Sequence, residues 1–213
     1  MKKNPGWLIM AKDAKSRFSD KKIVICISGM AGTGKSTLSK KLADKYGLQC
    51  YSGGDALKEL AKAEGYDVSR QGWWESPEGL NFLKKRVDDP KFDKSVDAEL
   101  LKYAQQGNVI LDSWTMPWLL NEGFKIWLMA SLEKRAARVA ERDKITLNEA
   151  FKVLEEKENK TRAIYKKLYS FVLGEDLAPF DLVLDTDDLS AEEVFAVLCK
   201  AVENVVLSAP EPQ

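Results

Sequence analysis

The stretch Gly29-Met-Ala-Gly-Thr-Gly-Lys35-Ser36 matches the pattern GxxxxGK[ST], in which a glycine-rich loop joins a strand to a helix. The β-branched run from Ile23 to Ser28 precedes it and is typical of a strand buried on both faces of a parallel sheet. A helical pattern from Ser36 to Tyr46 follows it, and Gly47 supplies a stop. The order strand, loop and helix is the context that gives this motif its meaning.

The loop residues point to the binding of a nucleoside triphosphate. Glycines let the backbone curl until successive N–H groups and the helix N-terminus face phosphate oxygens. Lys35 can then neutralise β- and γ-phosphate charge, and the Ser36 hydroxyl can ligate magnesium. The residues expected to contact the nucleotide, ATP, are Gly29, Met30, Ala31, Gly32, Thr33, Gly34, Lys35, Ser36 and Thr37. The motif leaves open whether the γ-phosphoryl group moves to water, to an acceptor, or nowhere.

Strands and helices alternate along the rest of the chain. Four more strand-like runs occur at 48–51, 108–112, 124–130 and 181–185. Helical patterns occur at 55–64, 78–87, 92–107, 131–142, 146–169 and 194–205, with a loop from 66 to about 78. This alternation predicts a three-layer α/β sandwich, a five-stranded parallel sheet with helices on both faces. Ligands then bind at the carboxyl ends of the strands.

The composition is that of a globular domain and excludes several kinds of chemistry. Of the 213 residues 45% are apolar and 31% charged, and 33 Lys plus Arg balance 33 Asp plus Glu. No bulk positive charge therefore exists to hold nucleic acid or an anionic membrane. The chain has no histidine, which excludes a Ser-His-Asp triad, a Cys-His dyad and histidine metal sites.

The cysteines and the chain ends indicate a cytoplasmic protein. Cys26, Cys50 and Cys199 are odd in number and widely spaced, so we expect reduced thiols without a chemical role. An apolar run near the start, residues 7–11, is too short for a membrane helix. We expect an N-terminal extension at 1–21, one domain at 22–207 and a disordered tail at 208–213. A monomer is the simplest expectation, with a dimer as the alternative.

Further segments follow the loop in a fixed order. They are Ser52-Gly-Gly-Asp-Ala-Leu-Lys-Glu-Leu-Ala61, Asp89-Pro-Lys-Phe-Asp-Lys-Ser-Val-Asp97, Gly107-Asn-Val-Ile-Leu-Asp112, Ile126-Trp-Leu-Met-Ala130 and Phe180-Asp-Leu-Val-Leu-Asp-Thr186. With the loop, residues 22–205 resemble the nucleoside monophosphate kinases, in particular archaeal-type cytidylate kinases. The resemblance implies a P-loop NTPase fold, an acceptor-binding region at about 52–106 and a helical lid at about 131–165. It implies magnesium-dependent transfer from ATP to a nucleoside monophosphate such as CMP.

Arginines in the lid segment are candidate catalytic residues. Arg135, Arg138 and Arg142 are spaced i, i+3 and i+7, on one helical face. The resemblance implies that lid arginines reach the transferring phosphoryl group, and Arg162 falls close to a family lid arginine. A solvated helix face is the alternative for each of them. With Lys35, we take Arg138, Arg142 and Arg162 as candidates.

Two aspartates follow predicted strands. Asp112 ends an apolar strand as a Walker B carboxylate does, so it is a candidate to hold magnesium or to accept the acceptor's proton. A turn or cap is the alternative. Asp55 either orients the acceptor or caps a helix beginning at Ala56.

The acceptor side departs from the family pattern. Cytidylate kinases of this type present an arginine after the third strand and another one turn into the helix after the second, where this chain has Trp114 and Lys58. Arginine and lysine are not interchangeable at a bidentate phosphate site. Tryptophans gather here instead, and they either stack a base, wall off a small metabolite or only pack: Trp73, Trp74, Trp114 and Trp118.

The substrate candidates are therefore Asp55, Lys58, Trp73, Trp74 and Trp114, with further cations nearby at Arg70, Lys84, Lys85 and Arg86. Asp93 and Asp97 either orient acceptor hydroxyls or face water, and we favour water. Two rival functions stay open. One is a kinase of the same fold for a non-nucleotide phosphorylated or hydroxylated metabolite, and the other is a nucleotide-binding switch without transfer.

Overall fold

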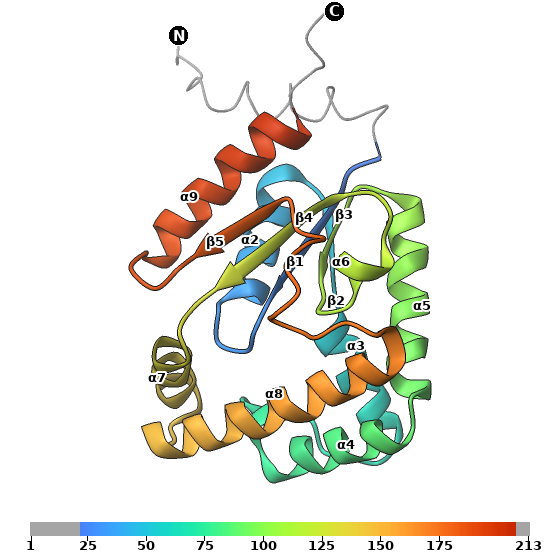
Figure 1. Cartoon of the computed structure of the whole chain (residues 1–213), viewed down its shortest axis with the longest axis vertical. Helices are drawn as coiled ribbons and strands as arrows, with labels where there is room; N and C mark the ends of the chain where they lie inside the picture. The colour runs from blue at the N-terminus through green and yellow to red at the C-terminus, as the bar shows by residue number, and fades with distance from the viewer. Residues whose placement is uncertain (1–21, 208–213) are drawn as a thin grey trace, which may run out of the picture.

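A computed structural model describes residues 22–207, so the expected extension and tail lie outside the described residues. Its centre is a parallel sheet of five strands in the order β2-β3-β1-β4-β5 (Figure 1). The strands are β1 (Val24–Gly29), β2 (Gln49–Ser52), β3 (Val109–Asp112), β4 (Phe124–Met129) and β5 (Leu182–Asp185). The predicted fold class and sheet are confirmed.

Both faces of the sheet are buried because its central strands are apolar at successive positions. Ile25 and Ile27 of β1 pack with α2 (Lys35–Tyr46) and α9 (Ala191–Ala201) on one face. Cys26 belongs to the core of the opposite face. There the covering elements are α3 (Gly53–Ala63), α5 (Lys91–Gln106) and α6 (Met116–Leu119).

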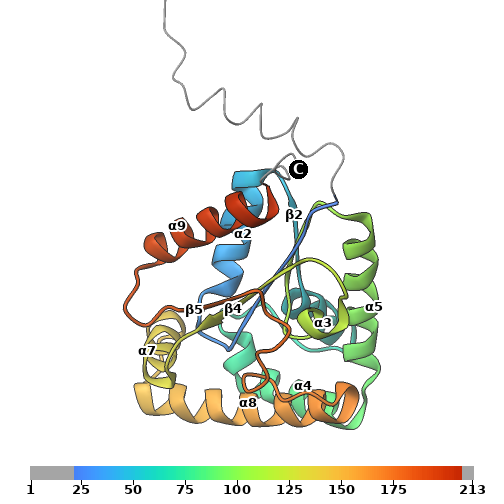
Figure 2. The same ribbon diagram turned by 45° about the horizontal axis from the view of Figure 1, so that its top comes forward.

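Three more helices lie across the carboxyl ends of the strands, where Figures 1 and 2 show α8 running beneath the sheet. They are α4 (Pro77–Asp88), α7 (Leu132–Asp143) and α8 (Leu147–Tyr169). A reciprocal cap between Thr146 and Glu149 begins α8. None of the helices within 22–207 is apolar over a length sufficient to cross a membrane.

One short element lies in a segment expected to be a loop, and another lies at the end of the expected last helix. A 3-10 helix, η1 (Trp73–Glu75), precedes α4, and a π-helical turn, η2 (Val202–Val206), ends the last helix. The start of α3 also differs from the expectation. The Ser52 hydroxyl accepts a hydrogen bond from the Asp55 N–H, so Ser52 is the cap of a helix that begins at Gly53. Of the two alternatives for Asp55, the cap of a helix beginning at Ala56 is therefore wrong.

The loop between β1 and α2 needs glycine at Gly32 for two reasons. Its φ is +85°, in the left-handed region that side chains disfavour. An added β-carbon would also lie 2.9 Å from the Arg135 carbonyl oxygen and 3.0 Å from the Arg135 β-carbon. The loop therefore lies against the first turns of α7.

We expect Gly32→Ala to destabilise the fold by roughly 2 kcal/mol or more, because strain and overlap add. Gly65→Ala is the matched control, since Gly65 has a φ of +91° but nothing within 4 Å of an added β-carbon. Urea unfolding of both variants measures the difference. Equal losses would contradict a close approach between the loop and α7.

Candidate active site

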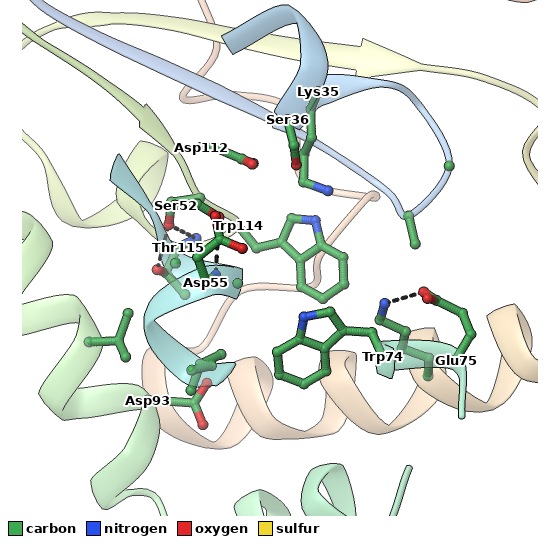
Figure 3. A pocket seen from close by; sticks show the side chains of 18 of the residues that line it. Lys35, Ser36, Ser52, Asp55, Trp74, Glu75, Asp93, Asp112, Trp114 and Thr115 are labelled. Carbon is green, nitrogen blue, oxygen red and sulfur yellow. Dashed lines mark hydrogen bonds and ion pairs between the residues drawn. The ribbon is translucent and has the colours of Figure 1, made fainter. Parts of the chain in front are cut away.

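A cavity of about 260 Å³ opens at the carboxyl ends of β1, β2 and β3. The glycine-rich loop forms one wall, and α3, η1, α5, α7 and α8 supply the others (Figure 3). Predicted site residues in its lining are Ala31, Gly32, Gly34, Lys35, Ser36, Thr37, Asp55, Trp74, Asp112, Trp114 and Arg142. The topology thus brings donor and acceptor candidates to one place.

Lys35 and Asp112 are the charged groups at the loop. Asp112 is 4% exposed and lies beside Ile27 in the sheet register. Burial lowers the pKa of Lys35, while the Asp112 carboxylate opposes that shift. The two positive side chains of Lys157 and Arg142 lower this pKa further. Several cations therefore converge on the space beside the loop.

Trp114 connects the loop to the acceptor side. Its indole Nε1 donates a hydrogen bond to the Gly29 carbonyl oxygen at 2.5 Å. The Lys35 ammonium lies 5.2 Å from the centre of a Trp114 ring, which is cation–π distance. Figure 3 shows the Trp114 ring beside Lys35 and above Trp74. Trp114 thus supports the end of β1 and forms part of the cavity wall.

A buried ion pair lies deep on the acceptor side. The Arg86 guanidinium donates to both Asp93 oxygens, at 2.6 and 3.1 Å, and both side chains are at most 3% exposed. The Arg86 guanidinium carbon is also 5.8 Å from a Trp74 ring centre. The interpretation of Asp93 as a solvent-facing residue is wrong, because its helix face packs against α4 and lines the cavity.

Asp97, the second aspartate on this face, is buried as well, so its solvent-facing interpretation is also wrong. Its carboxylate accepts hydrogen bonds from the Thr115 hydroxyl at 2.5 Å and from the Tyr169 hydroxyl. These bonds join α5, the segment after β3 and the end of α8. Burial raises the pKa of Asp97 to about 6, against the lowering effect of the two hydroxyl donors.

Glu75 and Lys157 are cavity residues that the sequence reasoning missed. Lys157 Nζ is 2.5 Å from a Glu75 oxygen, and Arg142 donates to the other oxygen at 2.8 Å. Lys157 shares its helix face with apolar Leu154 and Ile164, which are also buried. That helical spacing is a signal that could have placed Lys157 inside.

The other lid arginines bind backbone carbonyls. Arg135 pairs with buried Glu158 and donates to the Ala31 oxygen at 3.2 Å. Arg138 donates to the Gly32 oxygen at 3.4 Å and to the Thr186 oxygen at 3.1 Å. Neither Arg135 nor Arg138 lines the cavity, and their bonds to carbonyl oxygens show that this part of the helix face is not solvated. Of the three arginines at i, i+3 and i+7 only Arg142 lines the cavity, and its side chain is 43% exposed. The catalytic role of Arg138 stays a prediction.

Four more candidates lie outside the cavity. Arg162 donates to the Leu173 carbonyl oxygen at 3.0 Å. Trp73 is 1% exposed within the core, so the prediction that it contacts the acceptor is wrong. Trp118 stacks on Phe171 at a centroid distance of 3.9 Å. Lys58 lines a second cavity along β2 instead, which corrects its assignment to the acceptor site.

Comparison with known proteins places this site among kinases. The profile of the cytidylate kinase-like family matches residues 24–188. The chain is 35% identical over 185 residues to a cytidylate kinase of Pyrococcus horikoshii, covering 86% of this chain and 90% of the relative. It is 34% identical over 188 residues to a cytidylate kinase of Methanocaldococcus jannaschii, covering 86% and 99%.

Solved structures support the fold. A shikimate kinase of Acinetobacter baumannii in complex with shikimate matches with a TM-score of 0.54 and 16% identity, covering 92% of this chain and 99% of that one. A deoxyadenosine kinase of M. mycoides with bound dATP matches with a TM-score of 0.50 and 17% identity, covering 85% and 100%. At these identities the likeness concerns the fold alone.

Asp97 gives a testable pH dependence. Its pKa is about 6 in the folded protein and 3.8 ordinarily, so on raising the pH the unfolded chain loses this proton first. Ionisation of Asp97 therefore lowers the stability of the folded protein progressively from about pH 4 to pH 6. Above about pH 6 it causes no further loss. We measure the free energy of unfolding in urea for the wild type and Asp97→Asn at pH 4 and pH 7. Between pH 4 and pH 7 we expect the wild type to lose on the order of 2 kcal/mol relative to Asp97→Asn.

Tyr169→Phe supplies the companion measurement. It removes one donor to the ionised carboxylate, which raises the pKa of Asp97 in the folded protein. The pH range over which stability is lost then extends to higher pH, while its lower limit, set by the unfolded chain, is unchanged. A difference between wild type and Asp97→Asn that stays constant from pH 4 to 7 would contradict this account.

Proposed function

Since the chain belongs to the cytidylate kinase-like family, we propose that it transfers the γ-phosphoryl group of ATP to CMP. The protein is a phosphotransferase. The observation that carries the proposal is that the family match includes every strand, while Lys35, Asp112 and the acceptor-side residues line one cavity. Residues 52–106 are the proposed acceptor-binding region, and residues 131–165 the proposed lid.

The donor side suits a triphosphate. Backbone N–H groups at the start of α2 and the Lys35 ammonium bind phosphate oxygens. Ser36 and Asp112 would hold magnesium, which neutralises phosphate charge when bound. Both side chains line the cavity, and residues 22–207 contain no cluster of three acidic or cysteine ligands. Phosphate and water oxygens therefore complete the coordination, as magnesium prefers.

The absence of histidine from the chain is compatible with this reaction. The attacking group is an oxygen of the CMP phosphate, which is largely ionised at neutral pH because the second pKa of such a phosphate is about 6. No general base is then required, and catalysis rests on positioning and on cations. Of the two roles open to Asp112, we assign it metal binding rather than proton acceptance.

The acceptor side offers stacking surfaces and buried polar groups. Trp74 and Trp114 present aromatic rings to the cavity, and Arg86, Asp93 and Thr115 lie in its lining. A base stacks on such rings at a gain of about 1–3 kcal/mol. The lid side adds positive charge to the lining through Arg142 and Lys157.

A second candidate function keeps the fold but changes the acceptor. Trp114 and Lys58 stand where family members carry arginine, and Lys58 does not reach the main cavity. The loss of these cations and the tryptophans in the cavity wall favour a non-nucleotide phosphorylated or hydroxylated metabolite as the alternative substrate. We also propose a monomer, because one chain builds the whole cavity, in a reducing cytoplasm that suits three free cysteines.

An assay of ADP release with a panel of acceptors tests the proposal. We expect CMP, or dCMP, to stimulate turnover above all other nucleoside monophosphates and small phosphorylated metabolites, with the phosphorylated product confirmed by mass spectrometry. Preference for a non-nucleotide acceptor would establish the second candidate. ATP binding without any phosphorylated product would favour the function of a nucleotide-binding switch without transfer.

A pair of lid variants separates direct from indirect contact with phosphate. We expect Arg142→Ala to lower kcat by about a hundredfold, because a cation lining the cavity is lost. Arg138→Ala should lower kcat less and thermal stability more, since Arg138 binds two carbonyls behind the loop. Steady-state kinetics and thermal unfolding measure both. If Arg138→Ala folds but loses more kcat than Arg142→Ala, then Arg138 and not Arg142 contacts the phosphoryl group directly.

A further inference from the structure

Glu75 is a buried carboxylate held by two cations from the proposed lid. Its side chain is 5% exposed and follows Trp74 in η1, on the acceptor side. Lys157 from α8 approaches one oxygen at 2.5 Å, and Arg142 from α7 approaches the other at 2.8 Å. Charged hydrogen bonds of this kind are about twice as strong as neutral ones. Glu75 thereby joins the acceptor side to both lid helices.

The chain approaches the lid closely at this point. A side-chain carbon added at Gly72 would overlap the Asp143 carboxylate, which itself pairs with Arg142. Glycine at this position therefore allows η1 to reach the end of α7. In the ion pairs of Glu75 the carboxylate and Lys157 are buried, with side chains 5% and 10% exposed, whereas the Arg142 side chain is 43% exposed.

Both cations that hold Glu75 also face the cavity. Lys157 Nζ lies 5.6 Å from a Trp74 ring centre and 5.9 Å from a Trp114 ring centre. Arg142 and Lys157 line the same cavity as Lys35. Although burial raises the pKa of Glu75, the Lys157 and Arg142 charges hold it below its ordinary value. Glu75 is therefore an anion at neutral pH.

A carboxylate with two cations on its oxygens has the bonding pattern of a bound phosphate oxygen. We propose that Glu75 is the counter-ion that Lys157 and Arg142 hold before phosphate binds, and that phosphate oxygens entering the cavity compete with it for these two cations. Removing one partner of a buried ion pair normally leaves an uncompensated charge. Here the charge left by Glu75 faces a site for anions, so its loss strengthens phosphate binding.

This inference rests on the proposed function only in requiring that the cavity binds phosphate groups. Its test uses inorganic tripolyphosphate and no acceptor. If Glu75→Gln binds tripolyphosphate more tightly but the wild type does not phosphorylate CMP, the proposed acceptor is wrong and the role of Glu75 as counter-ion stands. If the wild type phosphorylates CMP but Glu75→Gln binds tripolyphosphate no more tightly than the wild type, the acceptor stands and the counter-ion role is wrong.

We expect Glu75→Gln to bind tripolyphosphate about five- to tenfold more tightly than the wild type in isothermal titration calorimetry, because an opposing charge at close range is lost. Glu78→Gln is the matched control: it removes the same charge three residues along, at an exposed site outside the cavity, and should leave affinity unchanged. Equal or weaker tripolyphosphate binding by Glu75→Gln would overturn the proposal. Glu75 would then only connect η1 to α7 and α8.

A double-mutant cycle distinguishes competition from a general field effect. In a Lys157→Met background the gain from Glu75→Gln should shrink at least twofold, because one of the contested cations is absent. An undiminished gain would overturn direct competition for Lys157. If circular dichroism finds Glu75→Gln unfolded, Glu75→Asp replaces it. Its shorter side chain cannot reach both cations, so we expect binding tighter than wild type, and equal or weaker binding overturns the proposal.

Discussion

The buried pair between Arg135 and Glu158 connects the parts of this molecule that have to act together. Arg135 belongs to α7 and Glu158 to α8, and the same guanidinium donates to the carbonyl oxygens of Ala31 and Ala130. The base of the proposed lid is thus bonded to the loop that receives phosphate. Removing either partner would leave the other as an unpaired buried charge, at a cost of about 3–5 kcal/mol, so Arg135 and Glu158 depend on each other.

That arrangement divides the lid cations into two groups. Arg135 and Arg138 each donate to a carbonyl oxygen of the loop, those of Ala31 and Gly32. Arg142 and Lys157 keep their charge inside the cavity, together with Lys35. One group sets the shape of the phosphate site and the other sets its charge. Helical spacing alone placed Arg135, Arg138 and Arg142 on one face and could not separate them.

The sheet was predictable because each of its strands is indicated by residues that are neighbours in the sequence. The run from Ile23, the glycine loop and the helix from Ser36 each follow from neighbouring residues, and alternating strands and helices then imply parallel order. Ser36 and Asp112 reach the cavity for the same reason, since each directly follows a strand or its loop. Burial of Asp97 and Glu75 was not predictable, because it depends on Tyr169 and Lys157 from distant segments. Asp93 pairs with Arg86, only seven residues earlier, but that pairing depends on how α4 packs on α5.

Trp114 has a consequence for how this site can change through evolution. Its indole holds the Gly29 carbonyl and lies against the ammonium groups of Lys35 and Lys157. Arginine there would bring another positive charge beside both lysines, and its guanidinium would have to replace the indole as the donor to the Gly29 carbonyl. The effect of exchanging Trp114 for arginine is therefore expected to depend on Lys157 and on its partner Glu75, which makes the three positions epistatically coupled.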